Sequence, residues 1–530
     1  MHALEAFLGL LVAVTVLAVV ARRLRLPYPI LMVLGGVGAA LIPGLPEIRL
    51  DSELVFLLIL PPILYGAAWF SSWRDIRRNA RPIGLLAIGC VLFTAVAIAM
   101  VAHWAVPGMP WGAAFVLGAI VSPPDAVAAT SVFQRLAVPR RIVTILEGES
   151  LINDATGLVA YRFAVAAVLT GGISLWSAGL QFLWGGIGGV LVGLGVGWIG
   201  LQCHRRMPDP TTEIILSLLL PYAAYLPAEA VHASGVLATV TAGLYIARQS
   251  ASLMSPATRV QAEGVWTTFI FLLNATVFIL IGLQLRGVLQ DIGSYSAAML
   301  LRSALLVSAA TVVVRIVWVF PATYLPRWLV RRIREQDPIR SWRWPALIAW
   351  NGMRGVVSLA AALALPFTTA GGEAFPYRSL IVFLAFVVIL VTLLGYGLTL
   401  PVVIRWLAIS DDGEKAREER EARVAASEAA LERLLELEER AEVAADALER
   451  IRGYYEERLR RLRSGTHAMD GAEQTDRYGG RRLRREAIAA ERNAVIRLRN
   501  AGTIGDDVLH LVQHDLDLEE LRGERHQHGL

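Results

Sequence analysis

The sequence predicts an all-α membrane protein of about 13 transmembrane helices with inverted repeats and two broken helices, followed by a helical cytoplasmic tail. Of its 530 residues, 55% are hydrophobic and only 18% are charged, and the mean hydropathy is +0.53. A soluble protein of this size has too little interior to hide so much apolar surface. Apolar runs recur up to about Ser410, where the composition changes abruptly.

The apolar runs have the length needed to cross the hydrocarbon core, about 17 to 25 residues. The two shortest runs, 212–227 and 233–247, are separated by the polar LPAEAVHASG, which fits a helical hairpin better than one long helix. The expected crossings are 4–21, 27–45, 51–70, 83–103, 112–131, 142–168, 175–201, 212–227, 233–247, 262–283, 296–320, 344–366 and 377–407.

Basic residues alternate between the loops in the way that fixes orientation. One set of alternate loops, including RDIRRNAR and RWLVRRIREQDPIRSWR, holds about twenty arginines, and the intervening loops hold only Arg49, Arg286 and Arg378. Cytoplasmic loops are the Arg-rich ones, so the N-terminus is expected outside and the tail inside. The start, MHALEAFLGLLVAV, lacks the basic region and cleavage site of a signal peptide and is interpreted as the first helix.

The composition also argues against several other classes of protein. The formal net charge is +5, but the arginines cluster in short loops, where membrane orientation explains them better than nucleic-acid binding. Cys90 and Cys203 fall in different apolar segments and suggest neither a disulfide framework nor a metal cluster. The phosphate-binding pattern GxxxxGK[ST] is missing from the sequence, and no cofactor is expected.

The segment 411–530 is expected to form a separate cytoplasmic domain after a transmembrane domain, 1–410. It is rich in helix formers, with acid/base pairs four residues apart and a narrow Leu/Ala stripe. This pattern is typical of a solvated helix or coiled-coil hairpin tethered to the last crossing. A dimer contact or a regulatory role is the alternative.

Asp154 is the principal candidate for an ion site. It lies about three turns into the run 142–168, close to mid-membrane, where a carboxylate is a functional-site hypothesis by default. Ser150 and Glu147 share its helix face, and Glu149 and Asn153 lie on an adjacent face. Carboxylate, hydroxyl and amide oxygens suit a small cation such as sodium or lithium, and the same carboxylate can hold a proton instead. The alternative is a protonated Asp that only joins helices.

The preceding run contains VSPPDAVAATS, in which two consecutive prolines must break the helix. Non-helical backbone at this depth is tolerated only beside a cavity or within protein. Asp125 is therefore expected at the break, where freed carbonyls and half-helix ends can hold an ion. A simple proline kink is the alternative.

Two arginines are expected deep in the membrane and should find an acid or helix-end carbonyls. Arg315 is assigned to Glu149 as a structural ion pair, and Arg354 lies between Gly352 and Gly355, which suggests a second interrupted helix. Four charged or titratable residues are interpreted as ordinary interfacial or surface side chains, namely Arg162, Arg302, Glu229 and His232.

These segments resemble the sodium/proton exchanger family of monovalent cation:proton antiporters, and bacterial members with long cytoplasmic tails resemble the chain most. The resemblance covers nearly all of residues 1–410. It is carried by GAIVSPPDAVAA, ILEGESLINDATG, EIILSLLLPYAAYLPAEAVHASGVLATVTAGL, FIFLLNATVFILIGLQL and NGMRGVVSLAAALALP.

The resemblance implies an inverted-repeat fold, a homodimer and a mobile core that moves against a dimerisation domain. It implies that Asp154 binds the ion or proton, with Asn153, Ser150 and Asp125 near it and sodium held transiently by the two aspartates. It also implies that Arg354 stabilises the second broken helix. The Asn-Asp pair is similar to the electroneutral branch of the family.

One departure from the family pattern concerns the first break. The usual Thr-Asp-Pro reads Pro124-Asp125-Ala126 here, so a hydroxyl ligand is absent.

The function expected from the sequence is exchange of sodium or lithium for protons across the plasma membrane, one for one, in pH and sodium homeostasis. Potassium/proton exchange on the same scaffold is the main alternative. A cation channel or a membrane sensor whose tail signals is a further alternative. A channel would more naturally show rings of acids or a repeated filter segment, and neither is evident in the sequence. An intramembrane hydrolase would need a nucleophile and a base within reach, and the sequence offers no intramembrane histidine as a base for Ser150. The protein is therefore not expected to be an enzyme.

Overall fold

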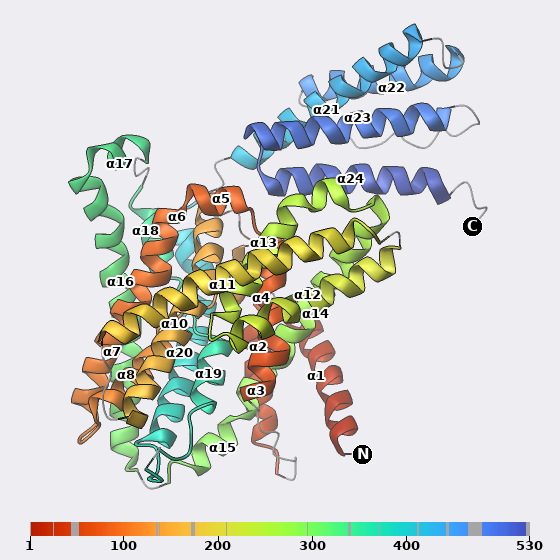
Figure 1. Ribbon diagram of the computed structural model, residues 1–530. Helices are drawn as coiled ribbons and strands as arrows, with labels where there is room; N and C mark the ends of the chain where they lie inside the picture. Colours follow the sequence, from red (N-terminus) through yellow and green to blue (C-terminus); the bar gives the residue numbers. More distant parts are fainter. Residues whose placement is uncertain are drawn as a thin grey trace.

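The computed structural model describes all of the chain except residues 1, 25, 44–51, 134–135, 137, 171–174, 208, 294, 338–340, 370, 411–412, 441–444, 465–479 and 526–530. The described residues are helical, with a single isolated β-bridge between Thr368 and Ala374. Arg25, Arg49 and Arg135, which contribute to the predicted orientation, lie outside the described residues. Figure 1 shows a body of long helices with a smaller helical layer at one end.

Within the described residues, seven helical segments are long and apolar enough to cross a membrane. They are Ala80–Ala105, made of α6 (Ala80–Gly84), the π-helical turn η2 (Leu85–Cys90) and α7 (Val91–Ala105); α10 (Arg140–Thr170); α11 (Leu175–His204), from Gly179; α12 (Pro210–Ala230); α14 (Pro256–Leu283) with α15 (Leu285–Gln290); α16 (Ala297–Leu329); and α20 (Arg378–Trp406).

Shorter apolar helices complete the body, so the architecture agrees with the prediction although the count of thirteen crossings is not established. Three of them are α2 (Tyr28–Ala40), α4 (Leu60–Trp69) with the π-helical turn η1 (Val55–Ile59), and α8 (Trp111–Val121). The remaining helices are α1 (His2–Leu24), α3 (Ser52–Leu54), α5 (Trp73–Arg78), α9 (Val127–Phe133), α13 (Gly235–Leu253), α17 (Arg331–Gln336), α18 (Arg343–Ala349) and α19 (Val356–Leu363).

The two weakest predicted crossings form separate helices, as the hairpin interpretation requires. Helix α12 ends at Ala230, and α13 begins after Ser234, whose hydroxyl accepts a hydrogen bond from the Leu237 amide at 3.2 Å. An N-cap of this kind satisfies one of the free amides at a helix start. The polar residues between the two runs therefore end one helix and cap the next.

Two helices are interrupted in mid-course. The first break separates α8 from α9 at Pro123 and Pro124, since proline has no amide hydrogen to continue the helical ladder. The second separates α18 from α19 across 351–355. The buried helix α20 packs against α8, α9 and α19. Both breaks thus lie inside protein, where irregular backbone can find partners.

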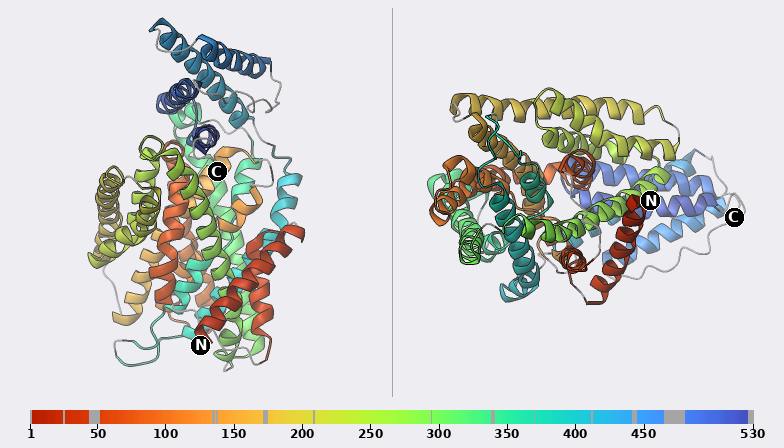
Figure 2. Two further views of the ribbon diagram at one scale, coloured as in Figure 1. Left: turned by 90° about the vertical axis from the view of Figure 1, so that its right-hand side faces the viewer. Right: turned by 90° about the horizontal axis from the view of Figure 1, so that it is seen from below.

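The described residues of the tail form four helices, α21 (Glu414–Glu439), α22 (Ala445–Ser464), α23 (Gly480–Ala501) and α24 (Asp506–Arg525). Leucine, alanine and other apolar residues of these helices make two small cores of their own. Figures 1 and 2 show the tail lying against the end of the body opposite to the start of α1. The boundary predicted at 411 falls on residues outside the described part of the chain.

Candidate functional site

Asp125 lies in the first break and joins it to the second. Its backbone amide donates to the carbonyl of Met353 at 2.7 Å, and its Oδ1 accepts from the Val127 amide at 2.9 Å, at the start of α9. A Cβ added at Gly355 would collide with the Asp125 carboxylate. Glycine at 355 is therefore what lets the two broken helices meet at this carboxylate.

Helix α10 holds the first break from the other side. The Asn153 side-chain amide donates to the Pro124 carbonyl at 2.5 Å, and the Ser150 hydroxyl accepts from the Ala126 amide at 3.3 Å. Two backbone groups that the break leaves without helical partners are thereby satisfied. The Pro124 carbonyl, at the position that departs from the family pattern, is therefore the hydrogen-bond acceptor of the Asn153 side chain.

Asp154 lies at the middle of the 31-residue helix α10 and is half-buried. Its carboxylate is within electrostatic range of Asp125. Among the described residues, no side chain or amide donates a hydrogen bond to it. A carboxylate in this position has its lone pairs free for a proton or a cation. The structure therefore brings Asp125, Ser150 and Asn153 together at the first break, with Asp154 next to Asn153 on α10.

Glu149 and Arg315 form a buried ion pair between α10 and α16. The two guanidinium Nη atoms donate to the two carboxylate oxygens at 2.6 and 2.8 Å, and the side chains are only 2% and 1% exposed. Arg315 also donates to the Ile348 carbonyl at the end of α18, at 3.2 and 3.3 Å. The guanidinium thus finds both an acid and a helix-end carbonyl, and it joins three helices beside the site.

Arg354 is buried in the second break. Its backbone amide donates to the Thr392 hydroxyl of α20 at 3.1 Å. Within the described residues its Nε and one Nη have no hydrogen-bond partner. The expected acid or carbonyl is therefore not seen for these two atoms, and Arg354 contributes a positive charge beside the interrupted helix.

Three groups that position the site were not singled out from the sequence, because they act through backbone atoms or from distant segments. They are the carbonyls of Met353 and Ile348 and the hydroxyl of Thr392. Only the interruption predicted at Arg354, from Gly352 and Gly355 on either side of it, pointed toward them.

The remaining charged candidates lie away from this point. Glu147 is half-buried on α10, nearer the tail than Asp154. Arg162 pairs with Glu229 at 2.6 Å, joining α10 to the end of α12, and both side chains are partly exposed. Arg302 lies over the ring of Trp104, 5.5 Å from its centroid. These contacts agree with interfacial side chains.

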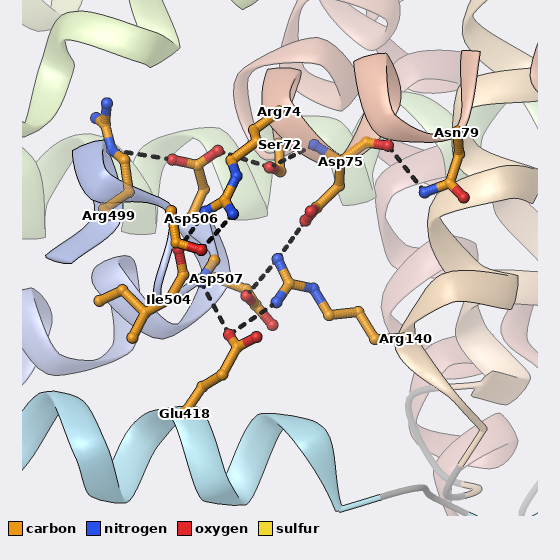
Figure 3. A network of polar contacts seen from close by, with 12 residues as sticks. Ser72, Arg74, Asp75, Asn79, Arg140, Glu418, Arg499, Ile504, Asp506 and Asp507 are labelled. Atoms are coloured by element: carbon orange, nitrogen blue, oxygen red, sulfur yellow. Dashed lines mark hydrogen bonds and ion pairs between the residues drawn. The ribbon is translucent and has the colours of Figure 1, made fainter. Parts of the chain in front are cut away.

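The tail makes a polar network with the end of α10, shown in Figure 3. Arg140, the first residue of α10, is ion-paired with Asp75 and also lies 2.8 Å from Asp507 and 3.3 Å from Glu418. Arg74 donates to the carbonyls of Gly502 and Ile504. The loop between α23 and α24 is thereby bound to α5 and to the helix that carries Asp154.

A second contact joins the tail to α14. Arg259 donates from Nε and Nη to the two carboxylate oxygens of Asp517, at 2.7 and 2.5 Å. His514 lies 3.2 Å from Glu263. Arg499 of α23 also donates to the Arg248 carbonyl of α13 at 2.9 Å. The tail is therefore docked on the body at several places, which differs from the tethered, solvated hairpin that its charge pattern suggests.

Two broken helices that meet beside an unpaired carboxylate in the middle of a long apolar helix are typical of the class of secondary transporters that bind ions at interrupted helices. A family model described as "Sodium/hydrogen exchanger, transmembrane" matches residues 10–406. The chain belongs to the sodium/hydrogen exchanger family.

Similar proteins agree with this assignment. A protein of Mycobacterium tuberculosis named "Uncharacterized Na(+)/H(+) exchanger" is 38% identical over 528 residues, covering 98% of this chain and 96% of the relative. The "Sodium, potassium, lithium and rubidium/H(+) antiporter" of Bacillus subtilis is 33% identical over 416 residues, covering 76% and 62%. The sodium proton antiporter MjNhaP1 of Methanocaldococcus jannaschii has the same fold, with a TM-score of 0.61, 20% identity and coverage of 77% and 98%.

Proposed function

We propose that the protein exchanges sodium or lithium for protons at Asp154. The observation that carries this proposal is the half-buried carboxylate of Asp154, which lies at mid-helix next to the contacts of α10 with the first break and has no partner among the described residues. A proton and a cation compete for this carboxylate. When one leaves on one side of the membrane and the other binds on the opposite side, the result is exchange.

The neighbouring groups divide by task in this proposal. Asp125 and the Ser150 hydroxyl supply further oxygen to a transient sodium ion, as the hard-ligand preference of alkali cations requires. Asn153 holds the Pro124 carbonyl and so fixes the shape of the break. Glu149 and Arg315 are a structural pair, and Arg354 offsets negative charge at the second break.

The substrate is proposed from the family, in which relatives are named for sodium and, in Bacillus subtilis, for sodium, potassium, lithium and rubidium. Potassium/proton exchange is therefore the second candidate. Proton flux in vesicles of the purified protein, driven by equal gradients of sodium, lithium and potassium, separates the two.

Exchange is proposed to be one for one and therefore electroneutral, because a single carboxylate that swaps one proton for one sodium moves no net charge. We place the protein in the plasma membrane as a homodimer, with the N-terminus outside and the tail in the cytoplasm, and assign transport to 1–410 and the attached domain to 411–530. An imposed membrane potential should leave the exchange rate unchanged. Ion flux without a counter-gradient would favour a channel instead.

Asp154→Asn tests the central role. The amide cannot exchange a proton, so sodium-dependent proton movement should fall to the background of empty vesicles while the protein still inserts. Asp291→Asn, an exposed acid in the turn after α15, is the matched control and should retain exchange. Full exchange by Asp154→Asn would overturn the proposal.

A further inference from the structure

Three arginines from three helices converge on one carboxylate at the tail-facing end of the body. Asp337, in the loop after α17, accepts from Arg141 of α10 at 2.7 Å and from Arg327 of α16 at 2.7 Å, and it is also ion-paired with Arg81 of α6. The Arg327 Nε donates in addition to the Asp337 backbone carbonyl at 2.9 Å. Several guanidinium groups around one set of oxygens is how proteins bind phosphate.

The cluster carries more positive charge than Asp337 neutralises. Burial favours the neutral form of the Asp337 carboxyl, but the hydrogen bond from Arg141 and the charges of the three arginines outweigh it and hold its pKa below the usual range. Asp337 is therefore ionised, and three guanidiniums against one carboxylate leave an excess of two positive charges. A second anion is thus electrostatically favoured at this place.

A cavity of about 70 Å³ lies beside the cluster. Its lining includes the three arginines together with apolar side chains such as Leu86, Val319 and Trp344. One water molecule needs roughly 10–15 Å³ on this measure, so the cavity has room for a phosphate-sized group. A lining that combines guanidinium groups with apolar side chains matches an amphiphile better than a free ion.

The surroundings place this cavity at the membrane surface. Trp328 and Trp342, which flank it along the chain, are 78% and 52% exposed. Exposed tryptophans are typical of the level of the lipid headgroups. The sequence from 327 to 343 also contains six arginines against two acids, and juxtamembrane basic segments attract anionic lipid.

We propose that this cavity binds the phosphate headgroup of an anionic phospholipid. The phosphate oxygens accept hydrogen bonds from Arg81, Arg141 and Arg327, whose guanidinium groups are now paired with the Asp337 carboxylate. The acyl chains extend along the apolar residues of the lining into the bilayer. Asp337 acts as a built-in competitor. Free phosphate could accept the same hydrogen bonds, but it would make no contact that uses the apolar residues of the lining or the exposed tryptophans.

Binding at this place would hold together the helices that carry the buried pair. Arg141 and Glu149 lie on α10, and Arg327 and Arg315 lie on α16. A phosphate that bridges Arg141 and Arg327 therefore fastens the same two helices that Glu149 and Arg315 join deeper in the membrane. The expected consequence is a lipid-dependent rise in thermal stability.

The test measures the melting temperature of the full-length protein in detergent with added phosphatidylglycerol, phosphatidylcholine or inorganic phosphate. Phosphatidylglycerol should raise it, and the other two should have little effect. The double variant Arg81→Gln/Arg327→Gln should lose at least half of the shift. Arg460→Gln/Arg463→Gln removes the same charge from exposed positions on the tail helix α22 and should keep the shift.

Asp337→Asn provides a second measurement that does not depend on the folding of the arginine variant. Removing the competing carboxylate should lower the phosphatidylglycerol concentration for half of the maximal shift by several-fold. Equal lipid shifts in the two double variants, weaker lipid binding by Asp337→Asn, or an equal effect of inorganic phosphate would each overturn the proposal, the last in favour of a free anion.

Discussion

Glu149 and Arg315 face each other through two parallel hydrogen bonds of 2.6 and 2.8 Å. Glu149 lies five residues before Asp154 on helix α10. Both side chains are almost completely buried. Removing one member of such a pair leaves an uncompensated charge and costs about 3–5 kcal/mol, whereas replacing both by apolar residues of similar size is often tolerated. The contribution of this pair to stability can therefore be tested separately from ion binding.

Glu149→Gln and Arg315→Gln should each lower the free energy of unfolding by about 3–5 kcal/mol. The double variant Glu149→Met/Arg315→Met should recover most of this loss, because neither charge remains. The melting temperatures of the four proteins in one detergent measure this directly. A double variant as unstable as the sum of the single ones would show that the two residues do not act as a pair.

Gly355→Ala should disturb the meeting of the two broken helices. The added Cβ would strike the Asp125 carboxylate, so the break must shift at a cost of about 1–3 kcal/mol, and exchange should fall strongly. Gly84→Ala in α6 is the matched control, because nothing lies within 4 Å of the added atom. Proton flux in vesicles and melting temperature are both measured, and normal flux in Gly355→Ala would remove the proposed role of this contact.

The interrupted helices and the position of Asp154 are predictable from the sequence because they rest on local causes. Pro123 and Pro124 cannot continue a helix, and Asp154 stands out as an acid within an apolar run. The contacts that shape the site depend on tertiary structure. Nothing local indicates that Asn153 donates to Pro124 or that Met353 accepts from Asp125.

The docking of the tail was not predictable for a related reason. Arg140 and Arg259 fit the expected pattern of arginines in cytoplasmic loops, and that pattern accounts for their charge without any partner. Their acidic partners in the tail, including Asp507 and Asp517, lie hundreds of residues away and read as ordinary members of a charged helix. Charge composition cannot distinguish a solvated acid from a paired one.

Arg140→Gln should loosen the tail. The change removes the shared partner of Asp75, Glu418 and Asp507. Partly buried ion pairs contribute on the order of 1 kcal/mol. Because the tail would then open more often, hydrogen exchange of the backbone amides at 502–507 should become about three- to tenfold faster. Added salt should do the same in the wild type, because it screens the pairs. Arg460→Gln, at an exposed tail position, is the control; equal exchange in both variants would show that Arg140 does not hold the tail.

Deleting residues 412–530 tests whether this docking affects transport. The contacts of Arg140 restrain the helix that carries Asp154, so a truncated protein should exchange ions with a changed rate or pH response. Proton flux across a pH series, compared with the full chain in the same vesicles, measures it. Unchanged rate and pH response would remove a regulatory role and leave the tail as an attached domain.

Glu491 gives the tail a pH dependence of its own. Its side chain is fully buried between α22 and α23, 3.1 Å from Arg458. Burial raises the pKa of this carboxyl to about 7, against the opposing charge of Arg458. The folded tail therefore holds the proton more tightly than the unfolded chain does, and the stability that this difference provides is complete below the unfolded pKa and is lost as the pH rises through the folded one.

Glu491→Gln should abolish this dependence. In the wild type, stability should fall by at most about 1.4 kcal/mol per pH unit between about pH 5 and about pH 7. Hydrogen exchange of α22 and α23 in the full-length protein should accordingly quicken over this window beyond the intrinsic effect of pH. Glu491→Gln has no titrating group at position 491, so its hydrogen exchange, corrected for the intrinsic effect of pH, should stay constant. The control Glu439→Gln, at the exposed end of α21, should behave like the wild type. A wild-type tail that grows more stable across the same window would contradict the assignment, because it would require that Arg458 outweigh burial and hold Glu491 ionised.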